Sequence, residues 1–434
     1  MPYLEDTCCT VRKGNCITLQ TGHLAAKGQN DMLPELDDRF VWASVGDSWA
    51  SGVSFSGQET EYDGDKNGCH RWKDSYGPMM ERNTTWTIGV QKFNFAACSG
   101  CRMRHILKEP QGDNPPQVDL VGNPQMMTYQ VGGNDCLFGN VIEDCIYQPG
   151  INYGAEYPDD SGQCARRIRQ SNDYVNNDTT KAGWGLYIDE LKTVRDTLNH
   201  PAVRDNKDFK LYILSYVKFF NLGANYCDDI SFGAFAWVPG GNAPKVSNRL
   251  RTDMNDGVDR VNKILARIAN DVNDPRVKYL DISPAFEGHR FCENHHKYLG
   301  QWREPDVWLW NFNPPIMDPP ADPSFMDSWL SQGKLPDGTV LSLPNGTDVG
   351  VEMQGGADTD GGTGSGRPQP TWSQRPFHPK PGRTEVIGNI VIAQALADKI
   401  PGVVGSSPPA TGACDCDESG CSPESPTCCA DGTC

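Results

Sequence analysis

Residues 40–52 read FVWASVGDSWASG, and this stretch decides the expected fold. Its apolar beginning, Phe40–Ala43, predicts a buried strand. Ser48 follows where that strand gives way to a turn that contains glycine. A strand end fixes the position of a side chain, and amide groups at the start of a following helix can face a developing negative charge. The stretch therefore predicts an α/β protein with a candidate nucleophile at Ser48.

Three later segments occur in an order that suits one shared site. Gly46-Asp47-Ser48 alone is a weak signal, because these residue types also form ordinary turns. Two apolar runs end in small or polar residues, and a third segment places a histidine before a helical pattern. In chain order they are residues 93–100 (FNFAACSG), 126–135 (MMTYQVGGND) and 375–379 (RPFHP).

The ordered set resembles the SGNH, or GDSL-type, hydrolases, whose blocks are Gly-Asp-Ser-x-x-x-Gly, a glycine, Gly-x-Asn-Asp and a late histidine. All of these blocks occur in family order between residues 38 and 400. Smaller matches resemble the secreted, disulfide-containing branch found in actinomycetes and fungi; they lie at residues 69–78, 97–100 and 286–292. The resemblance implies a single three-layer, doubly wound parallel sheet of flavodoxin-like topology.

The resemblance assigns chemistry to two residues that lie far apart in the sequence. Ser48 would attack an ester carbonyl, and His378 would act as general base and later as general acid. A serine hydroxyl is too weak an acid to ionise unaided near neutral pH, whereas imidazole titrates in that range. A carboxylic-ester hydrolase of this kind uses no cofactor, and no metal ion is expected.

The same resemblance implies an oxyanion hole for the tetrahedral intermediate. Its donors would be the backbone amides of Ser48 and Gly100 and the side-chain amide of Asn134. Glycine lets the backbone approach a substrate closely, and the asparagine amide has two N–H donors. We expect Asp135 to fix the Asn134 amide, and we expect Asp47 to cap a helix or hold the turn.

One position departs from the commonest family pattern. Arg375 stands three residues before His378, where most members carry an aspartate. Because a guanidinium cannot accept a hydrogen bond, we hypothesise that the main-chain carbonyl of Arg375 orients the imidazole. A remote carboxylate, such as Asp306 or Asp318, is the alternative. His289 is expected to line the site as a structural residue.

The sequence indicates an ester substrate but does not determine its acyl group or its alcohol. The released acid is either acetate from a polysaccharide or a fatty acid from a lipid, and Trp49 is a candidate wall of an acyl or sugar pocket. Two other functions remain: a secreted binding protein that kept the fold but lost turnover, and an acyltransferase that acylates a sugar. The complete set of serine, glycine, asparagine and histidine argues against the binding protein.

Composition and charge exclude some partners. The 434 residues, 37% of them apolar, with 45 glycines and 32 prolines, indicate a loop-rich globular protein with a core. The net charge of −17 argues against nucleic acid, whose phosphates need a basic surface, and against anionic membranes. No apolar run is long enough to span a bilayer. We expect a monomer whose partner is an ester substrate.

The 17 cysteines point to an oxidising compartment outside the cytosol. An odd number leaves one thiol free or paired elsewhere. The motif formed by Cys98 and Cys101 is interpreted as structural rather than redox-active. By resemblance, three disulfides are implied: Cys69–Cys98, Cys145–Cys164 and Cys227–Cys292.

Export is also indicated by three glycosylation sequons, which begin at Asn83, Asn177 and Asn345. The beginning MPYLED has neither the basic start nor the apolar run of a signal peptide. We therefore expect a secreted glycoprotein whose true N-terminus is missing from this sequence, or which began as part of a longer protein.

The chain is expected to contain three regions. Residues 1–37 form a cysteine-containing lead, residues 38–400 the hydrolase domain, and residues 401–434 a cysteine-rich tail. Within the domain, residues 310–375 form a long insertion rich in proline and glycine, which we expect to cover part of the site. The tail has no aromatic residue that could stack on a sugar.

Hydrophobic patterns predict further elements of the domain. Strands are predicted at 209–220 and 277–282, and helices at 253–272 and 383–398. Strands that alternate with helices imply a parallel sheet covered on both faces. Ligands then bind at the carboxyl ends of the strands, where Ser48 is expected to lie.

Overall fold

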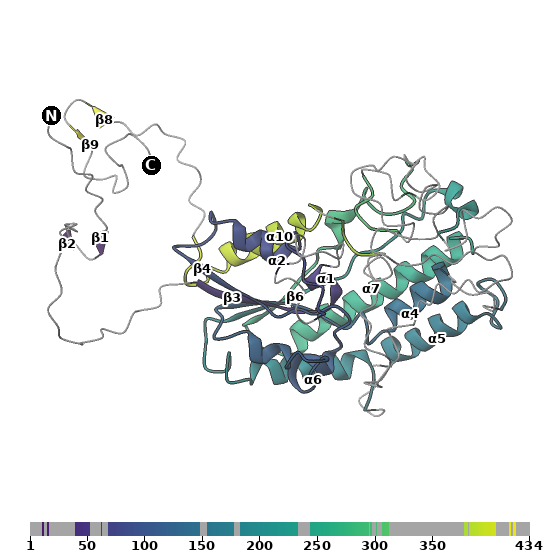
Figure 1. The fold of residues 1–434 in the computed structure, drawn as a ribbon, viewed down its shortest axis with the longest axis horizontal. Coiled ribbons are helices and arrows are strands. Elements are labelled where there is room, and N and C mark those ends of the chain that lie inside the picture. The colour runs from purple at the N-terminus through teal and green to yellow at the C-terminus, as the bar shows by residue number, and fades with distance from the viewer. Residues whose placement is uncertain are drawn as a thin grey trace. The chain divides into compact units, whose positions relative to one another are not determined.

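A parallel sheet of five strands forms the centre of the protein (Figure 1). The strand order is β4-β3-β5-β6-β7, so β3, the first of these strands in the chain, lies between β4 and β5. The strands are β3 (Phe40–Gly46), β4 (Gln91–Phe95), β5 (Met126–Gln130), β6 (Lys210–Leu214) and β7 (Val277–Leu280). The computed structural model describes residues 11–12, 15–16, 40–52, 62, 68–147, 154–177, 183–232, 244–294, 296, 301, 306–311, 377–380, 382–404, 416–417 and 420–421.

Helices cover both faces of this sheet, which confirms the predicted α/β class. On one face α2 (Tyr76–Arg82) packs against α10 (Glu385–Ala397), and Figure 1 shows α6 (Leu186–Leu198) on the opposite face. There α6 contacts both α3 (Met103–Leu107) and α7 (Asn248–Asp271). The other α-helices of the described residues are α1 (Ser48–Ser51), α4 (Phe138–Ile142) and α5 (Gln163–Asn176).

The strands are buried because both faces of the sheet are covered. All residues of β5 are buried, and so are all but one of the residues of β3. Such strands read as nearly continuous apolar runs rather than as an alternating pattern. All neighbouring strands of this sheet pair in parallel. In their register, Trp42 of β3 lies opposite Phe93 of β4 on one side and Met126 of β5 on the other. The Trp42 and Phe93 rings stack with their centroids 4.0 Å apart.

Two predicted elements differ from those observed by more than three residues at one end. The strand predicted at 209–220 ends at Leu214, because the chain then leaves the sheet and follows α7. There, side chains of α7 satisfy its backbone: Asn262 bonds both backbone groups of Tyr216, and Asn255 accepts from Phe219 N. The helix predicted at 253–272 begins earlier, at Asn248. The prediction missed its first turn because that turn is largely polar and shows little apolar periodicity.

All three implied disulfides are present: Cys69–Cys98, Cys145–Cys164 and Cys227–Cys292. Cys98 is bonded to Cys69 and Cys101 is a free, buried thiol, so these two cysteines are not bonded to each other. Cys136 is a second free, buried thiol among the described cysteines.

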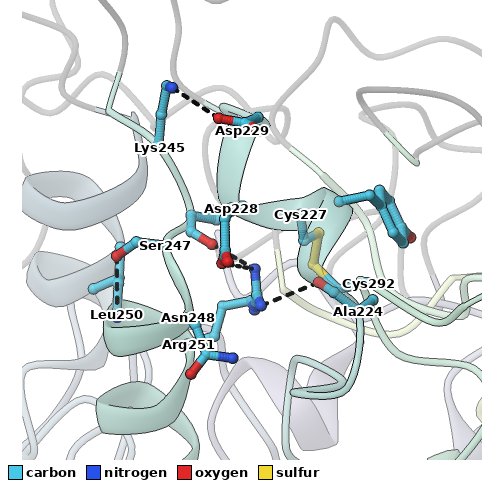
Figure 2. A network of polar contacts seen from close by, with 12 residues as sticks. Ala224, Cys227, Asp228, Asp229, Lys245, Ser247, Asn248, Leu250, Arg251 and Cys292 are labelled. Atoms are coloured by element: carbon cyan, nitrogen blue, oxygen red, sulfur yellow. Dashed lines mark hydrogen bonds and ion pairs between the residues drawn. A yellow bond between two sulfur atoms is a disulfide. The ribbon is translucent and has the colours of Figure 1, made fainter.

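A buried arginine fixes the beginning of α7 beside the Cys227–Cys292 disulfide (Figure 2). The side chain of Arg251 is fully buried and donates to Val246 O at 2.8 Å and to Ala224 O at 3.2 Å. It also forms an ion pair with Asp228 at 3.1 Å. These contacts compensate the burial of the charge and hold the start of α7 in place.

The contacts of the chain divide it into two units, Asp38–Val404 and a second one formed by Met1–Asp37 with Gly405–Cys434. In the second unit the described residues form two antiparallel pairs, β1 (Val11–Arg12) with β2 (Asn15–Cys16) and β8 (Cys416–Asp417) with β9 (Gly420–Cys421). The expected insertion at 310–375 lies outside the described residues except for its first two positions. Among the described helices, none is both long enough and apolar enough to cross a bilayer.

Candidate active site

Ser48 begins α1 directly after the end of β3. The close approach of β3 and β5 makes glycine necessary at position 46. Gly46 has φ +148°, and a Cβ there would lie 2.2 Å from Gln130 O. The side-chain amide of Gln117 also bonds both backbone groups of Gly46, at 2.7 and 2.9 Å. The backbone that precedes the serine is therefore fixed on both sides.

Asp47 caps α1, as predicted, and its second oxygen has a further partner. Oδ1 accepts from Trp49 N at 3.0 Å, and Oδ2 accepts from the hydroxyl of Tyr216 at 2.6 Å. Burial raises the pKa of Asp47 to about 6, and the hydrogen bond from Tyr216 opposes this shift. The carboxyl group is thus part of the scaffold under Ser48.

Tyr216 was missed by sequence reasoning. Its hydroxyl donates to Asp47 and accepts from Gly133 N at 3.1 Å, so it joins the turn before Ser48 to the loop that carries Asn134. The available signal was its position, because Tyr216 follows β6 closely and the carboxyl ends of parallel strands meet at one edge.

His378 lies beside Ser48, although the two residues are 330 positions apart. Its Nε2 is 2.6 Å from Ser48 Oγ, and its side chain is buried, with 5% of the residue exposed. Trp310 fixes the backbone of this segment: Trp310 N donates to His378 O at 2.9 Å, and Phe377 N donates to Trp310 O at 2.7 Å. The structure therefore brings the two predicted catalytic residues within hydrogen-bond distance.

Asn134 is fixed by a different partner from the one expected. Its Nδ2 donates to Cys101 O at 3.0 Å, whereas Asp135 Oδ2 accepts from Met103 N at 3.1 Å. The expectation that Asp135 holds the Asn134 amide is wrong, because the carboxyl group turns to the first residue of α3. Both contacts nevertheless tie the loop of Asn134 to the loop that follows Gly100.

Gly100 lies in that neighbouring loop, which is anchored to the nucleophile turn. Cys98 N donates to Gly46 O at 3.0 Å, and Cys98 is also bonded to Cys69. Gly100 has φ +79°, a conformation that favours glycine. Four neighbouring strands thus contribute to one edge: Gly100 follows β4, Ser48 β3, Asn134 β5 and Tyr216 β6.

Four more residues were predicted to lie near the site: His289, Asp306, Asp318 and Arg375. Arg375 and Asp318 lie outside the described residues. Asp306 contacts His289 through its main-chain oxygen, 3.0 Å from His289 Nδ1. The His289 ring stacks on Trp308, with 3.6 Å between the centroids. His289 therefore has a structural contact, and its residue is half-buried.

A cavity of about 90 Å³ lies beside Ser48 and Asn134. Trp49 lines it, as expected for a residue next to the nucleophile. Most other walls are apolar side chains of α4, α5 and α7 and of the segment after β6, which sequence reasoning did not connect with the site. They are Phe138, Val141, Ile168, Val175, Phe219, Met254, Val258 and Val261. Helical spacing made these positions indistinguishable from ordinary core residues.

No group of three or more histidine, cysteine or acidic residues in the described ranges is arranged to hold a metal ion. Ser48 and Asn134 line the mainly apolar cavity, and the imidazole of His378 lies beside Ser48.

Comparisons with known proteins find no matching family and no matching curated sequence. Among solved structures, the chain is similar to an extracellular lipase from Streptomyces rimosus, with 20% identity and a TM-score of 0.46 over 82% of this chain and 98% of that one. A phospholipase A1 from Streptomyces albidoflavus NA297 gives 19% identity and a TM-score of 0.42 over 65% and 90%. A lipase from a goat rumen metagenome gives 14% and 0.30 over 57% and 83%.

Proposed function

We propose that this protein hydrolyses carboxylic esters, with Ser48 as nucleophile and His378 as general base. The observation that carries the proposal is the 2.6 Å separation of His378 Nε2 from Ser48 Oγ. A nucleophile and a base within hydrogen-bond reach, beside a cavity, form the arrangement that covalent catalysis by serine requires.

The reaction follows from the order in which these groups meet an ester. His378 Nε2 takes the hydroxyl proton as Ser48 Oγ bonds to the carbonyl carbon. The resulting tetrahedral intermediate collapses when the carbon–oxygen bond to the alcohol breaks, and the imidazolium gives its proton to the leaving oxygen. Water then enters by the same route, His378 removes its proton, and the acid leaves with Ser48 restored.

Three N–H groups are proposed to stabilise the negative oxygen of the intermediate. They are the backbone amides of Ser48 and Gly100 and the side-chain amide of Asn134. One N–H of Asn134 binds Cys101 O, and this contact supports a role for the second N–H toward the substrate. Loss of one such donor typically costs about 3–4 kcal/mol in the transition state.

The imidazole also needs a partner that holds its orientation. Asp47 is unsuited to this role, since its two oxygens accept from Trp49 N and from Tyr216. We propose that the main-chain carbonyl of Arg375 accepts from His378 Nδ1, which makes the enzyme a dyad with a backbone partner.

The apolar walls of the cavity favour an ester with a hydrocarbon acyl chain over an acetyl ester. An acyl chain gains free energy when it leaves water for such a cavity, by roughly 0.8 kcal/mol for each methylene buried. We further propose that the protein acts outside the cytosol, which the three disulfides support.

Hydrolysis of p-nitrophenyl esters from acetate to palmitate tests this proposal. Ser48→Ala and His378→Ala should each lose at least about 10⁴-fold in kcat. Ser51→Ala is the matched control, because Ser51 lies in the same short helix and its hydroxyl is buried without a hydrogen-bond partner. It should keep the activity of the original protein. Undiminished hydrolysis by folded Ser48→Ala would contradict the proposal.

The same assay separates hydrolysis from acyl transfer. A mono- or disaccharide is added as acceptor, and the products are identified by mass spectrometry. We expect free acid as the main product, whereas a predominant acylated sugar would identify a transferase. No Ser48-dependent turnover of any ester would favour a binding protein.

A further inference from the structure

A glycine lies in the interior of α7, where its presence costs helix stability. Gly257 is far from both ends of this helix, which runs from Asn248 to Asp271. Glycine is less favourable than alanine in a helix because it gains more conformational freedom on unfolding. Apart from its chain neighbours and the backbone of its own helix turns, a Cβ built on Gly257 would have no atom within 4 Å. Close packing therefore does not explain the glycine.

Two other helical glycines show what a packing requirement looks like. A Cβ on Gly77 in α2 would lie 2.6 Å from Phe93 Cζ. A Cβ on Gly388 in α10 would lie 3.1 Å from Met80 Cγ. Both allow another residue to approach the helix closely, whereas Gly257 faces open space.

The cavity beside Ser48 reaches Gly257. Gly257 lines it together with four other residues of α7, spaced so that they share one face of the helix. They are Asp253, Met254, Val258 and Val261. The helices α4 and α5 supply other walls of the cavity, and α5 contacts both α4 and α7.

Gly257 stands in the middle of this wall. At one end, Asn262 follows Val261 and bonds the backbone of Tyr216, whose hydroxyl reaches Asp47 beside the nucleophile. That end is therefore the catalytic one.

The other end of the wall is polar. Asp253 lines the cavity there and accepts hydrogen bonds from Arg249 Nε, at 2.6 Å, and from the hydroxyl of Tyr157. From Asp253 to Val261 the wall extends roughly 12 Å, at the helical rise of 1.5 Å per residue. A cavity that follows a wall of this length, apolar from Met254 to Val261, suits a medium-length acyl chain.

We propose that the missing side chain of Gly257 keeps the cavity open, so that this position determines which acyl chains the protein accepts. The inference rests on the proposed hydrolysis at Ser48 and deepens it by assigning the acyl chain to the α7 wall. A larger side chain would fill the middle of the cavity and leave space for a short acyl group at the catalytic end.

The test compares kcat/KM for p-nitrophenyl acetate, butyrate, octanoate and decanoate. The original protein should prefer octanoate and decanoate. Gly257→Leu should keep its activity on acetate and lose at least about tenfold on decanoate, since exclusion from an apolar pocket has effects of this size. A folded Gly257→Leu with an unchanged ratio of decanoate to acetate activity overturns the inference.

Two controls separate the cavity from general effects on the helix. Gly257→Ala adds one methyl group to open space and should raise the melting temperature while keeping the preference for long chains. Asp256→Leu adds the same large side chain at the exposed neighbouring position and should leave the preference unchanged. A preference lost equally in Asp256→Leu would also contradict the inference.

A binding measurement distinguishes failure of the inference from failure of the proposed function. Sodium decanoate is titrated by calorimetry into Ser48→Ala and into Ser48→Ala combined with Gly257→Leu. Binding by the first and not by the second supports the inference, even if the original protein hydrolyses no ester. Equal binding by both, or by neither, overturns it, whatever the outcome of the ester assay.

Discussion

The hydroxyl of Tyr216 donates to Asp47 Oδ2 at 2.6 Å, and both residues are buried. Because the same hydroxyl accepts from Gly133 N, one phenol holds the nucleophile turn and the Asn134 loop in fixed relation. The position of the Ser48 hydroxyl relative to the Asn134 side chain then depends on this phenol. Tyr216 is a positioning residue in this account.

Tyr216→Phe should reduce kcat by about tenfold, which corresponds to 1.4 kcal/mol in the barrier. The change leaves the buried Asp47 carboxyl group without one partner, so the free energy of unfolding should fall by about 1–3 kcal/mol. Tyr187→Phe is the matched control, because that hydroxyl donates at 2.7 Å to Asp271, at the end of α7. If both variants have the same kcat as the original protein, Tyr216 does not position the site.

Asn134→Ala should lower kcat by about 10²–10³-fold and leave KM nearly unchanged, because an oxyanion donor acts mainly in the transition state. Steady-state kinetics on one ester separate the two constants. Asn172→Ala changes an asparagine that lines the same cavity from α5, and it should affect KM more than kcat. A loss confined to KM in Asn134→Ala would count against the proposed oxyanion hole.

Arg375→Ala should retain most of the activity, because the proposed partner of His378 is a main-chain carbonyl that every residue possesses. The measurement is kcat for the variant, with circular dichroism to establish folding. An inactive, well-folded variant would show that the arginine side chain is required. Asp306→Ala and Asp318→Ala test the alternative carboxylates, and full activity in both would favour the carbonyl.

The protein should lose stability as the pH rises from about 4 to 7 through its buried carboxyl groups. Burial raises the pKa of Asp135 from 3.8 to about 7, so the folded state holds a proton that the unfolded chain has already released. Each such group lowers the free energy of unfolding by at most about 1.4 kcal/mol per pH unit. Asp47, with a pKa raised to about 6, acts in the same direction.

Asp135→Asn should flatten this decline, because the amide can still accept from Met103 N but does not titrate. Urea unfolding at several pH values measures the difference between the two proteins. Asp113→Asn, at an exposed position, should leave the slope unchanged. An identical slope in the original protein and in Asp135→Asn would refute the role given to burial.

Much of the fold could be predicted because its signals are local. The buried strands read as nearly continuous apolar runs, α7 shows the periodicity of a helix packed on a sheet, and α10 is apolar over most of its length. Ser48 and His378 could be paired through the order of the motifs, although no local pattern relates residues so distant. The disulfides followed from the same resemblance.

The rest of the site depends on contacts that a sequence does not encode locally. Tyr216 and Trp310 look like ordinary buried aromatic residues until the fold places them beside Asp47 and His378. In the sequence, Gly257 is only a residue that lowers the stability of a helix. Its proposed role follows from the cavity that it lines. The partner of Asn134 was mistaken because nearness in sequence was taken for contact.

Reaction with a fluorophosphonate tests the central claim most directly, since this reagent bonds to an activated serine and needs no knowledge of the substrate. Mass spectrometry of the labelled protein should find one adduct, on the peptide that contains Ser48, formed far more slowly in His378→Ala. No adduct on the folded protein, or one that forms on Ser48 equally fast without the imidazole, would contradict the account.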